Sequence, residues 1–303
     1  MLSLLIGLTI AALLPQLSAA VSAPISSDVV AFITNEAWDA AFLSPNATGQ
    51  APVDGFNIST PYPGAKSGSW SWSIQVKNDM PNGNSKFVTG TWIQLDAPDD
   101  LLQPAGSSSS IDPSWYICDS LYFVDGLTSD AASVDAGCGG VLPAECKADM
   151  LRAMASGFNK ASSRVFRCPS VDLVPSCKDA FGKGWYGVAS TIDRDRKPGP
   201  SSSGTFDFAR IGLDEDEHEA GNLTAYDKSI RQIYIAGLIW GYSNVSSPGE
   251  SLTPETSLSC LRANRITEGS RKLSAGVSMS SGGSLGLAVL AVLVAGVVSA
   301  WLF

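Results

Sequence analysis

The sequence predicts a mainly β protein: a single β-sandwich or jelly-roll-like domain with short helical insertions and three disulfides. Residues 69–77, Ser-Trp-Ser-Trp-Ser-Ile-Gln-Val-Lys, alternate polar and apolar side chains, which is typical of a strand with one buried face. A turn-rich segment at 79–85 leads into a second β-type run at 87–95, so the two runs predict a hairpin with a longer loop. An even number of cysteines, six, predicts the disulfides.

The remaining β-type runs lie farther along the chain. Residues 230–240 would suit a buried helix as well, but Ile233, Ile235 and Ile239 stand at alternate positions, which favours a strand. The other strands are expected at 115–124, 185–192 and 205–211.

Two helices are expected between the strands. Residues 143–157 begin with Pro143 and end with Gly157, the residue types that favour a helix start and a helix end. Residues 34–42 predict a second helix with Thr34 as its N-cap.

Apolar segments at the two ends predict targeting signals. Residues 2–20 have the length and the small-residue ending of a signal peptide, so cleavage is expected after Ala20. Residues 285–303 follow an uncharged spacer and the small triplet that starts at Ser274, which is the pattern of a glycosylphosphatidylinositol (GPI) signal. Ser274 is the expected lipidation site, with Gly276 or Ser278 as the next choices, and a single membrane span is the alternative.

These signals define the expected organisation of the chain. The signal peptide occupies residues 1–20, and a glycosylated, disulfide-bonded β-rich domain occupies 21–266. A Ser/Gly-rich stalk with the attachment region follows at 267–284, and the hydrophobic tail at 285–303 is removed. The expected location is the extracellular face of the plasma membrane or the cell wall.

Potential modification sites agree with this location. N-glycosylation requires the pattern Asn-x-Ser/Thr in the secretory lumen, and four such sequons are present, at Asn46, Asn57, Asn222 and Asn244. The six cysteines are expected to be oxidised there; they are Cys118, Cys138, Cys146, Cys168, Cys177 and Cys260. Sequence alone leaves the pairing open, and our choice is two short loops, Cys138–Cys146 and Cys168–Cys177, with Cys118–Cys260 as the long one.

Charge and motif content argue against several function classes. The net charge is −9 and basic residues are not clustered, so nucleic acid is not an expected partner. The single histidine, His218, argues against two-histidine metal sites, and no phosphate loop or dinucleotide fingerprint occurs. We therefore expect no cofactor and no metal.

An acidic run at 214–219 is the main candidate for catalysis. Alternate residues of a strand point the same way, so Glu215, Glu217 and Glu219 would line one face of a groove. Retaining glycosidases place two carboxyl groups about 5 Å apart. The spacing resembles the Glu-x-Asp-x-Glu motif of β-jelly-roll glucanases and transglycosylases, but Glu217 replaces the Asp, and Asp216 and His218 replace apolar residues. The favoured interpretation is a solvated acidic loop, and a calcium site is a further alternative.

Aromatic residues of the hairpin are the candidate binding residues. Trp70 and Trp72 share one strand face, and Trp92 is expected to face them across the hairpin. Exposed indoles stack on sugar rings, whereas strands with one apolar face normally bury it. Core packing is the favoured interpretation.

The layout of the chain and its cysteine pattern resemble secreted, GPI-anchored surface proteins of the filamentous-fungal type. The pattern comprises Trp-Tyr-Ile-Cys at 115–118 and Cys-Gly-Gly-Val-Leu-Pro-Ala-Glu-Cys at 138–146. The resemblance transfers no catalytic residue. It implies a GPI-anchored surface protein but no biochemical activity. From the sequence as a whole we expect a non-enzymatic cell-surface or cell-wall glycoprotein, with wall polysaccharide as the candidate ligand. A cell-wall glycoside hydrolase or transglycosylase is the alternative.

Overall fold

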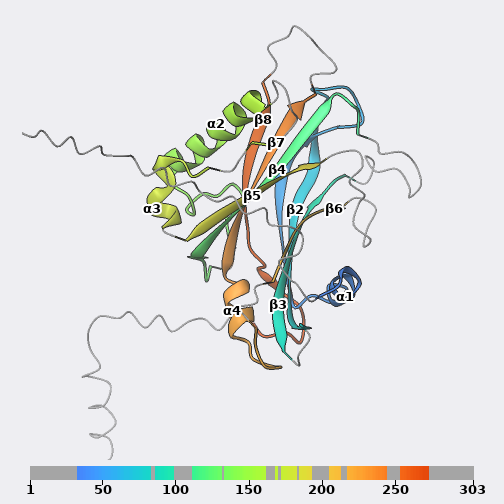
Figure 1. Ribbon diagram of the computed structural model, residues 1–303, viewed down its shortest axis with the longest axis vertical. Helices are drawn as coiled ribbons and strands as arrows, with labels where there is room; N and C mark the ends of the chain where they lie inside the picture. Colours follow the sequence, from blue (N-terminus) through green and yellow to red (C-terminus); the bar gives the residue numbers. More distant parts are fainter. Residues whose placement is uncertain are drawn as a thin grey trace, which may run out of the picture.

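The computed structural model describes residues 33–82, 86–98, 111–131, 133–161, 168–169, 172–182, 184–192, 205–212, 217–243 and 253–272. Two antiparallel sheets face each other within these residues, and helices cover their outer faces (Figure 1). The predicted β-sandwich with short helical insertions is confirmed.

The five-stranded sheet has the order β6-β3-β2-β1-β9. In chain order its strands are β1 (Ala47–Phe56), β2 (Lys66–Pro81), β3 (Phe87–Asp96), β6 (Thr205–Ile211) and β9 (Arg265–Ile266). The predicted hairpin is confirmed as β2 and β3, with Trp72 opposite Leu95.

The four-stranded sheet has the order β5-β4-β7-β8. Its strands are β4 (Trp115–Thr128), β5 (Trp185–Ile192), β7 (Gln232–Tyr242) and β8 (Glu255–Leu261). The segment at 230–240 is therefore a strand, as predicted, and it lies in the centre of the sheet where both of its faces are buried.

Aromatic side chains fill the space between the two sheets. The rings of Trp70 and Trp240, one from each sheet, meet edge to face with their centroids 5.0 Å apart. Each indole N–H also donates to a backbone carbonyl of β1, from Trp70 to Phe56 (3.0 Å) and from Trp240 to Asp54 (3.2 Å). Trp70 and Trp240 are therefore buried with their polar N–H groups paired.

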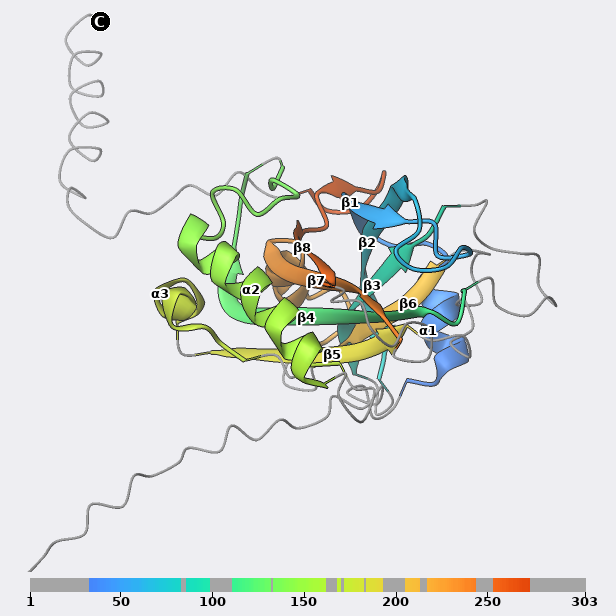
Figure 2. The same cartoon turned by 90° about the horizontal axis from the view of Figure 1, so that it is seen from above.

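Helices lie on the two outer faces, on opposite sides of the sandwich (Figure 2). The long helix α2 (Ala144–Ala161) crosses the four-stranded sheet and buries Met150, Met154 and Phe158. The short helix α1 (Asn35–Ala41) packs on the five-stranded sheet, and its N-cap Thr34 accepts a hydrogen bond from the Ala37 N–H (3.2 Å). Both predicted helices are confirmed. Three shorter elements complete the fold: the 3-10 helix η2 (Pro175–Cys177), α3 (Lys178–Phe181) and α4 (Thr224–Ser229).

All six cysteines are paired in three disulfides, but the predicted pairing is wrong. The pairs are Cys118–Cys168, Cys138–Cys260 and Cys146–Cys177. Cys118–Cys168 joins β4 to the segment after α2. Cys138–Cys260 joins the turn before α2 to β8, and Cys146–Cys177 joins α2 to η2. Short loops were expected from closeness in sequence, whereas the fold places partners together that lie 31 to 122 positions apart.

The folded domain extends past the expected boundary at residue 266. Thr267 donates its N–H to the Asn46 carbonyl (2.9 Å), and Tyr226 donates its hydroxyl to the Arg271 carbonyl (3.3 Å). The Arg271 guanidinium also pairs with Asp227 (2.9 Å). Residues 267–271, which the sequence pattern assigns to the stalk, therefore contact the domain.

The described part of the chain contains no helix that is long and apolar enough to cross a membrane. The predicted signal peptide and hydrophobic tail lie outside the described residues.

Ionisation of Tyr62 is expected to make the domain sensitive to alkali. Its hydroxyl donates to the Thr253 carbonyl (2.8 Å), and burial, with a smaller contribution from Glu255, raises the pKa of Tyr62 from 10.0 to about 12. Because the folded pKa is the higher one, the stabilisation is complete below pH 10 and is lost as the pH rises through 12. Denaturant titrations across this range should show the free energy of unfolding falling with pH, less steeply in Tyr62→Phe. Equal slopes in the two proteins would contradict this assignment.

Candidate functional site

The acidic run places two of its candidate carboxylates on the surface. His218 forms an antiparallel bridge with Phe87 (N···O distances of 2.8 and 3.0 Å), and its side chain is buried. Glu217 and Glu219 flank it, and both are exposed. Glu215 lies outside the described residues.

Neither described glutamate has the environment of a glycosidase acid. Glu217 accepts a hydrogen bond from the Asn82 amide (2.6 Å), and Glu219 pairs with Lys86. The hydrogen bond from Lys86, followed by its charge, lowers the pKa of Glu219. A general acid needs the opposite shift, because it must hold its proton at the working pH. The geometry of Glu217 and Glu219 therefore adds no support to the hydrolase alternative.

The same residues do not form a calcium site in the part of the chain that the structure describes. No group of three or more His, Cys, Asp or Glu side chains there is arranged to hold a metal ion.

The three candidate binding tryptophans are buried rather than exposed. Trp70, Trp72 and Trp92 are 1%, 0% and 2% exposed, so none of them presents a ring face to a sugar. The favoured interpretation, core packing, is confirmed. The expected position of Trp92 is wrong, however: it lies on the outer face of the sheet, against α1, whereas Trp70 and Trp72 lie between the sheets.

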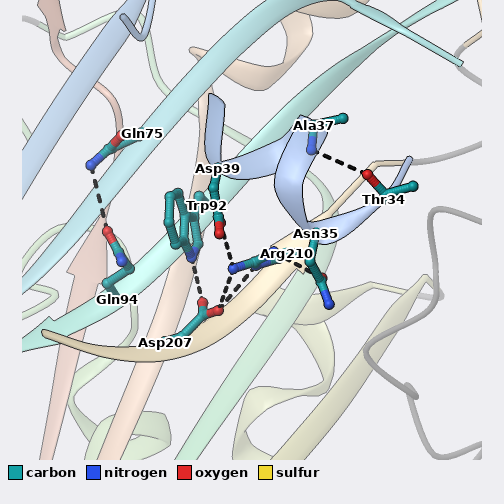
Figure 3. A network of polar contacts seen from close by, with 9 residues as sticks. All are labelled: Thr34, Asn35, Ala37, Asp39, Gln75, Trp92, Gln94, Asp207 and Arg210. Carbon is teal, nitrogen blue, oxygen red and sulfur yellow. Dashed lines mark hydrogen bonds and ion pairs between the residues drawn. The ribbon is translucent and has the colours of Figure 1, made fainter. Parts of the chain in front are cut away.

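Trp92 belongs to a polar network that holds α1 on the sheet (Figure 3). The Arg210 guanidinium donates to Asp39 (2.8 Å) and Asn35 (3.0 Å) of α1 and to Asp207 of its own strand, β6 (3.0 Å). It lies 4.8 Å from the centroid of the Trp92 ring, and the Trp92 N–H donates to Asp207. Because the polar groups of the network bond to one another and join α1 to β3 and β6, the network has a structural role.

A cavity of about 670 Å³ lies between α2 and the four-stranded sheet. Its floor includes Ser120 and Tyr122 of β4, and its walls include Met154 and Gly157 of α2. Asp172, in the segment that leads to η2, also lines it. The volume is in the range of pockets that hold small molecules.

The cavity has a rigid frame. The Cys118–Cys168 disulfide forms part of its wall, and Cys146–Cys177 ties α2 to η2 at its side. Gly157 is required at its position because a Cβ there would lie 2.6 Å from the Pro169 side chain. This contact brings the helix close to the segment that carries Cys168, so the walls are fixed before any ligand enters.

Two hydroxyl groups stand on the floor of the cavity. Ser120 is 5% exposed, and its hydroxyl has no hydrogen-bond partner among the residues that the structure describes. Tyr122 is also buried; burial, and then the charge of Asp172, raise the pKa of its phenol far above the usual value. The phenol therefore keeps its proton across the physiological range and is able to donate a hydrogen bond.

Sequence reasoning did not identify this cavity as a site. Its polar residues are common types with no characteristic spacing, and the cavity exists only because α2 lies across β4 and β7. The one available signal was the cysteine content of the region, since the Cys118–Cys168 disulfide lines the cavity and the Cys146–Cys177 disulfide joins the adjoining elements α2 and η2.

Comparison of the chain with protein-family models, with curated proteins and with solved structures finds no match. The assignment of a function therefore depends on the geometry described above and on the sequence signals.

Proposed function

We propose that this chain is a secreted glycoprotein that a GPI lipid attaches to the cell surface, where its β-sandwich engages wall polysaccharide without cleaving it. The observation that carries the proposal is the pairing of all six cysteines in three disulfides. Disulfides persist in secreted proteins and are rare in reducing compartments, so the domain is suited to the extracellular side.

The end of the domain supports attachment at Ser274. The last described contacts of the chain are those of Arg271 with Asp227 and Tyr226, three positions before Ser274. A lipid at that residue would hold the α4 end of the sandwich next to the membrane. Figure 1 shows α2 in the opposite half of the molecule, so the helix that covers the cavity would lie away from the bilayer.

The environments of the sequons predict which of them carry a glycan. Asn46 is engaged in the fold: its amide NH₂ donates to the Ser270 hydroxyl (3.1 Å), and its oxygen accepts from the Asn78 N–H (2.8 Å). The amide oxygens of Asn57 and Asn222 accept hydrogen bonds in turns within their own sequons. Asn244 lies outside the described residues.

We therefore expect glycans on Asn57 and Asn222 and little or none on Asn46, because a sugar there would disrupt the hydrogen bond between Asn46 and Ser270. Peptide mass mapping after enzymatic deglycosylation of the secreted protein measures the occupancy of each site. Full occupancy of Asn46 in a protein of normal stability would show that this contact is dispensable.

Binding to wall polysaccharide is tested with the secreted domain and insoluble glucan, mannan and chitin particles. The wild-type protein should sediment with one of them and release no reducing sugar from it. Glu217→Gln and Glu219→Gln should bind equally well, since both glutamates pair with neighbours on the surface. Release of reducing ends by the wild type that disappears in Glu217→Gln would instead establish the hydrolase alternative.

A further inference from the structure

We propose that the cavity under α2 is a binding site for a neutral sugar, of the size of one or two residues at the end of a polysaccharide chain. The inference deepens the proposed function and rests on it for the source of the ligand. Four observations carry it: the volume, the hydroxyls of the floor, the apolar walls and the charge of the lining.

The volume and the frame suit a small rigid ligand. About 670 Å³ accommodates a mono- or disaccharide but not a folded peptide. The walls are held by the Cys118–Cys168 and Cys146–Cys177 disulfides, so little ordering is required when a ligand enters.

The floor carries one hydroxyl, that of Ser120, without a partner among the described residues, and the Tyr122 phenol lies on the same strand. Ser120 and Tyr122 are two residues apart on β4, so their side chains leave the same face of the strand about 7 Å apart. The Ser120 hydroxyl lies beside Gly237 of β7, where a Cβ would approach it to 2.4 Å, and close to Met154 above it. A buried hydroxyl without a protein partner is unfavourable, and a ligand hydroxyl would satisfy it.

The walls suit the apolar face of a sugar ring. Met154, Val174 and Ile239 provide apolar surface between the polar groups of the lining, which include Ser156 at the mouth. A sterol or an acyl chain requires one polar partner, whereas the hydroxyls that ring a sugar require several. The interleaving of polar and apolar groups therefore favours the sugar.

The charge of the lining favours a neutral ligand. Two acidic residues, Asp119 and Asp172, belong to the lining that the structure describes, and no basic residue of the described lining balances them. The Asp119 carboxylate is engaged by the Ser190 N–H (3.1 Å) and hydroxyl, so Asp172 is the acidic group nearest a ligand. Negative charge in the lining repels anions, so fatty acids and phosphorylated ligands are disfavoured.

The test uses the complete disulfide-bonded domain and calorimetric titration with soluble trisaccharides of glucose, mannose and N-acetylglucosamine. Ser120→Ala removes one hydrogen bond to the ligand and should weaken binding about 3- to 10-fold. Ser257→Ala is the matched control, because Ser257 also has a buried hydroxyl without a partner among the described residues, on β8 and away from the cavity. Both variants should be as stable as the wild type, since each loses only an unpaired group.

A second pair of variants tests the site by steric blocking, so that the result does not depend on the loss of one hydrogen bond. Ser156→Trp places a large side chain at the mouth and should abolish sugar binding, whereas Arg152→Trp, on the same helix and outside the lining, should not. Unchanged thermal midpoints confirm that both variants are folded.

The outcomes separate this inference from the proposed function. Sugar binding that is lost in Ser156→Trp and weakened in Ser120→Ala supports the cavity as the site. Equal binding of sugars and of insoluble polysaccharide by all four variants would overturn the cavity while leaving the proposed function intact. Binding of cholesterol in detergent micelles, but of no sugar, would overturn the ligand class, and sedimentation with no polysaccharide would remove the wall ligand from the proposed function.

Discussion

Removal of the Cys138–Cys260 disulfide by replacing both residues with serine is expected to lower the free energy of unfolding by about 5 kcal/mol. The disulfide closes a loop of 122 positions, the longest of the three, and ties the turn before α2 to the edge strand β8. Of the three disulfides, its removal should increase the conformational entropy of the unfolded chain the most. Denaturant unfolding of the purified domain measures the effect.

The other two disulfides are internal controls for this prediction. Their separations of 50 and 31 positions predict losses of about 4 kcal/mol each, with Cys146–Cys177 the smallest. Peptide mapping without reduction should recover the three observed pairs. A peptide that joins Cys138 to Cys146 would contradict the fold around α2, and an order of stabilities unrelated to loop length would contradict the entropic explanation.

Replacement of Arg210 by alanine is expected to cost about 3 kcal/mol, because it leaves Asp39 and Asp207 without their shared cation under α1. The Arg210 side chain is only 14% exposed, so water does not readily replace it. Arg210→Lys should recover only part of the loss, since an ammonium group cannot reach Asn35, Asp39 and Asp207 together or stack on Trp92.

The matched control for Arg210 is Arg152→Ala. Arg152 pairs with Asp149 one turn away on α2, its side chain is 76% exposed, and the change should cost less than about 0.5 kcal/mol. Thermal or denaturant unfolding compares the two variants. A loss at Arg210 no larger than that at Arg152 would show that α1 does not depend on this network.

Strong local patterns predicted much of the fold. The alternation at 69–77 identified β2, and the spacing of isoleucines identified β7 as a strand. Thr34 identified the start of α1 because its side-chain cap is a local interaction, formed with Ala37 three residues away.

Strand β1 was not predicted, because its first three inward-facing positions carry small residues in place of β-branched ones. Ala47, Gly49 and Ala51 are buried at alternate positions, but Gly and Ala are poor strand formers. Gly49 is required there because a Cβ would lie 2.0 Å from the Arg262 carbonyl oxygen. That close approach is a tertiary contact with a residue far along the chain, so the sequence around residue 49 does not predict it.

Register explains the error at Trp92. The loop between β2 and β3 is long, so the sequence did not fix which residues of the two strands face each other. In the structure Trp92 is opposite Gln75, and Trp72 is opposite Leu95. Since a shift of one residue exchanges the two faces of a strand, the same sequence pattern is compatible with either face until the register is known.

The cavity and the disulfide pairing could not be predicted from the sequence for a related reason. Both depend on where α2 lies on the four-stranded sheet, which brings Cys146 to Cys177 and Met154 over Ser120. By contrast, the exposure of Glu217 and Glu219 agrees with what their charged residue type alone leads one to expect.

The measurement that tests the proposed function most directly is treatment of intact cells that display the protein with phosphatidylinositol-specific phospholipase C. Our account predicts that the enzyme releases the protein into the medium, and that mass spectrometry finds a C-terminal peptide that ends at Ser274 and carries the glycan of the anchor. Retention on the cells together with a C-terminal peptide that ends at Phe303 would contradict it.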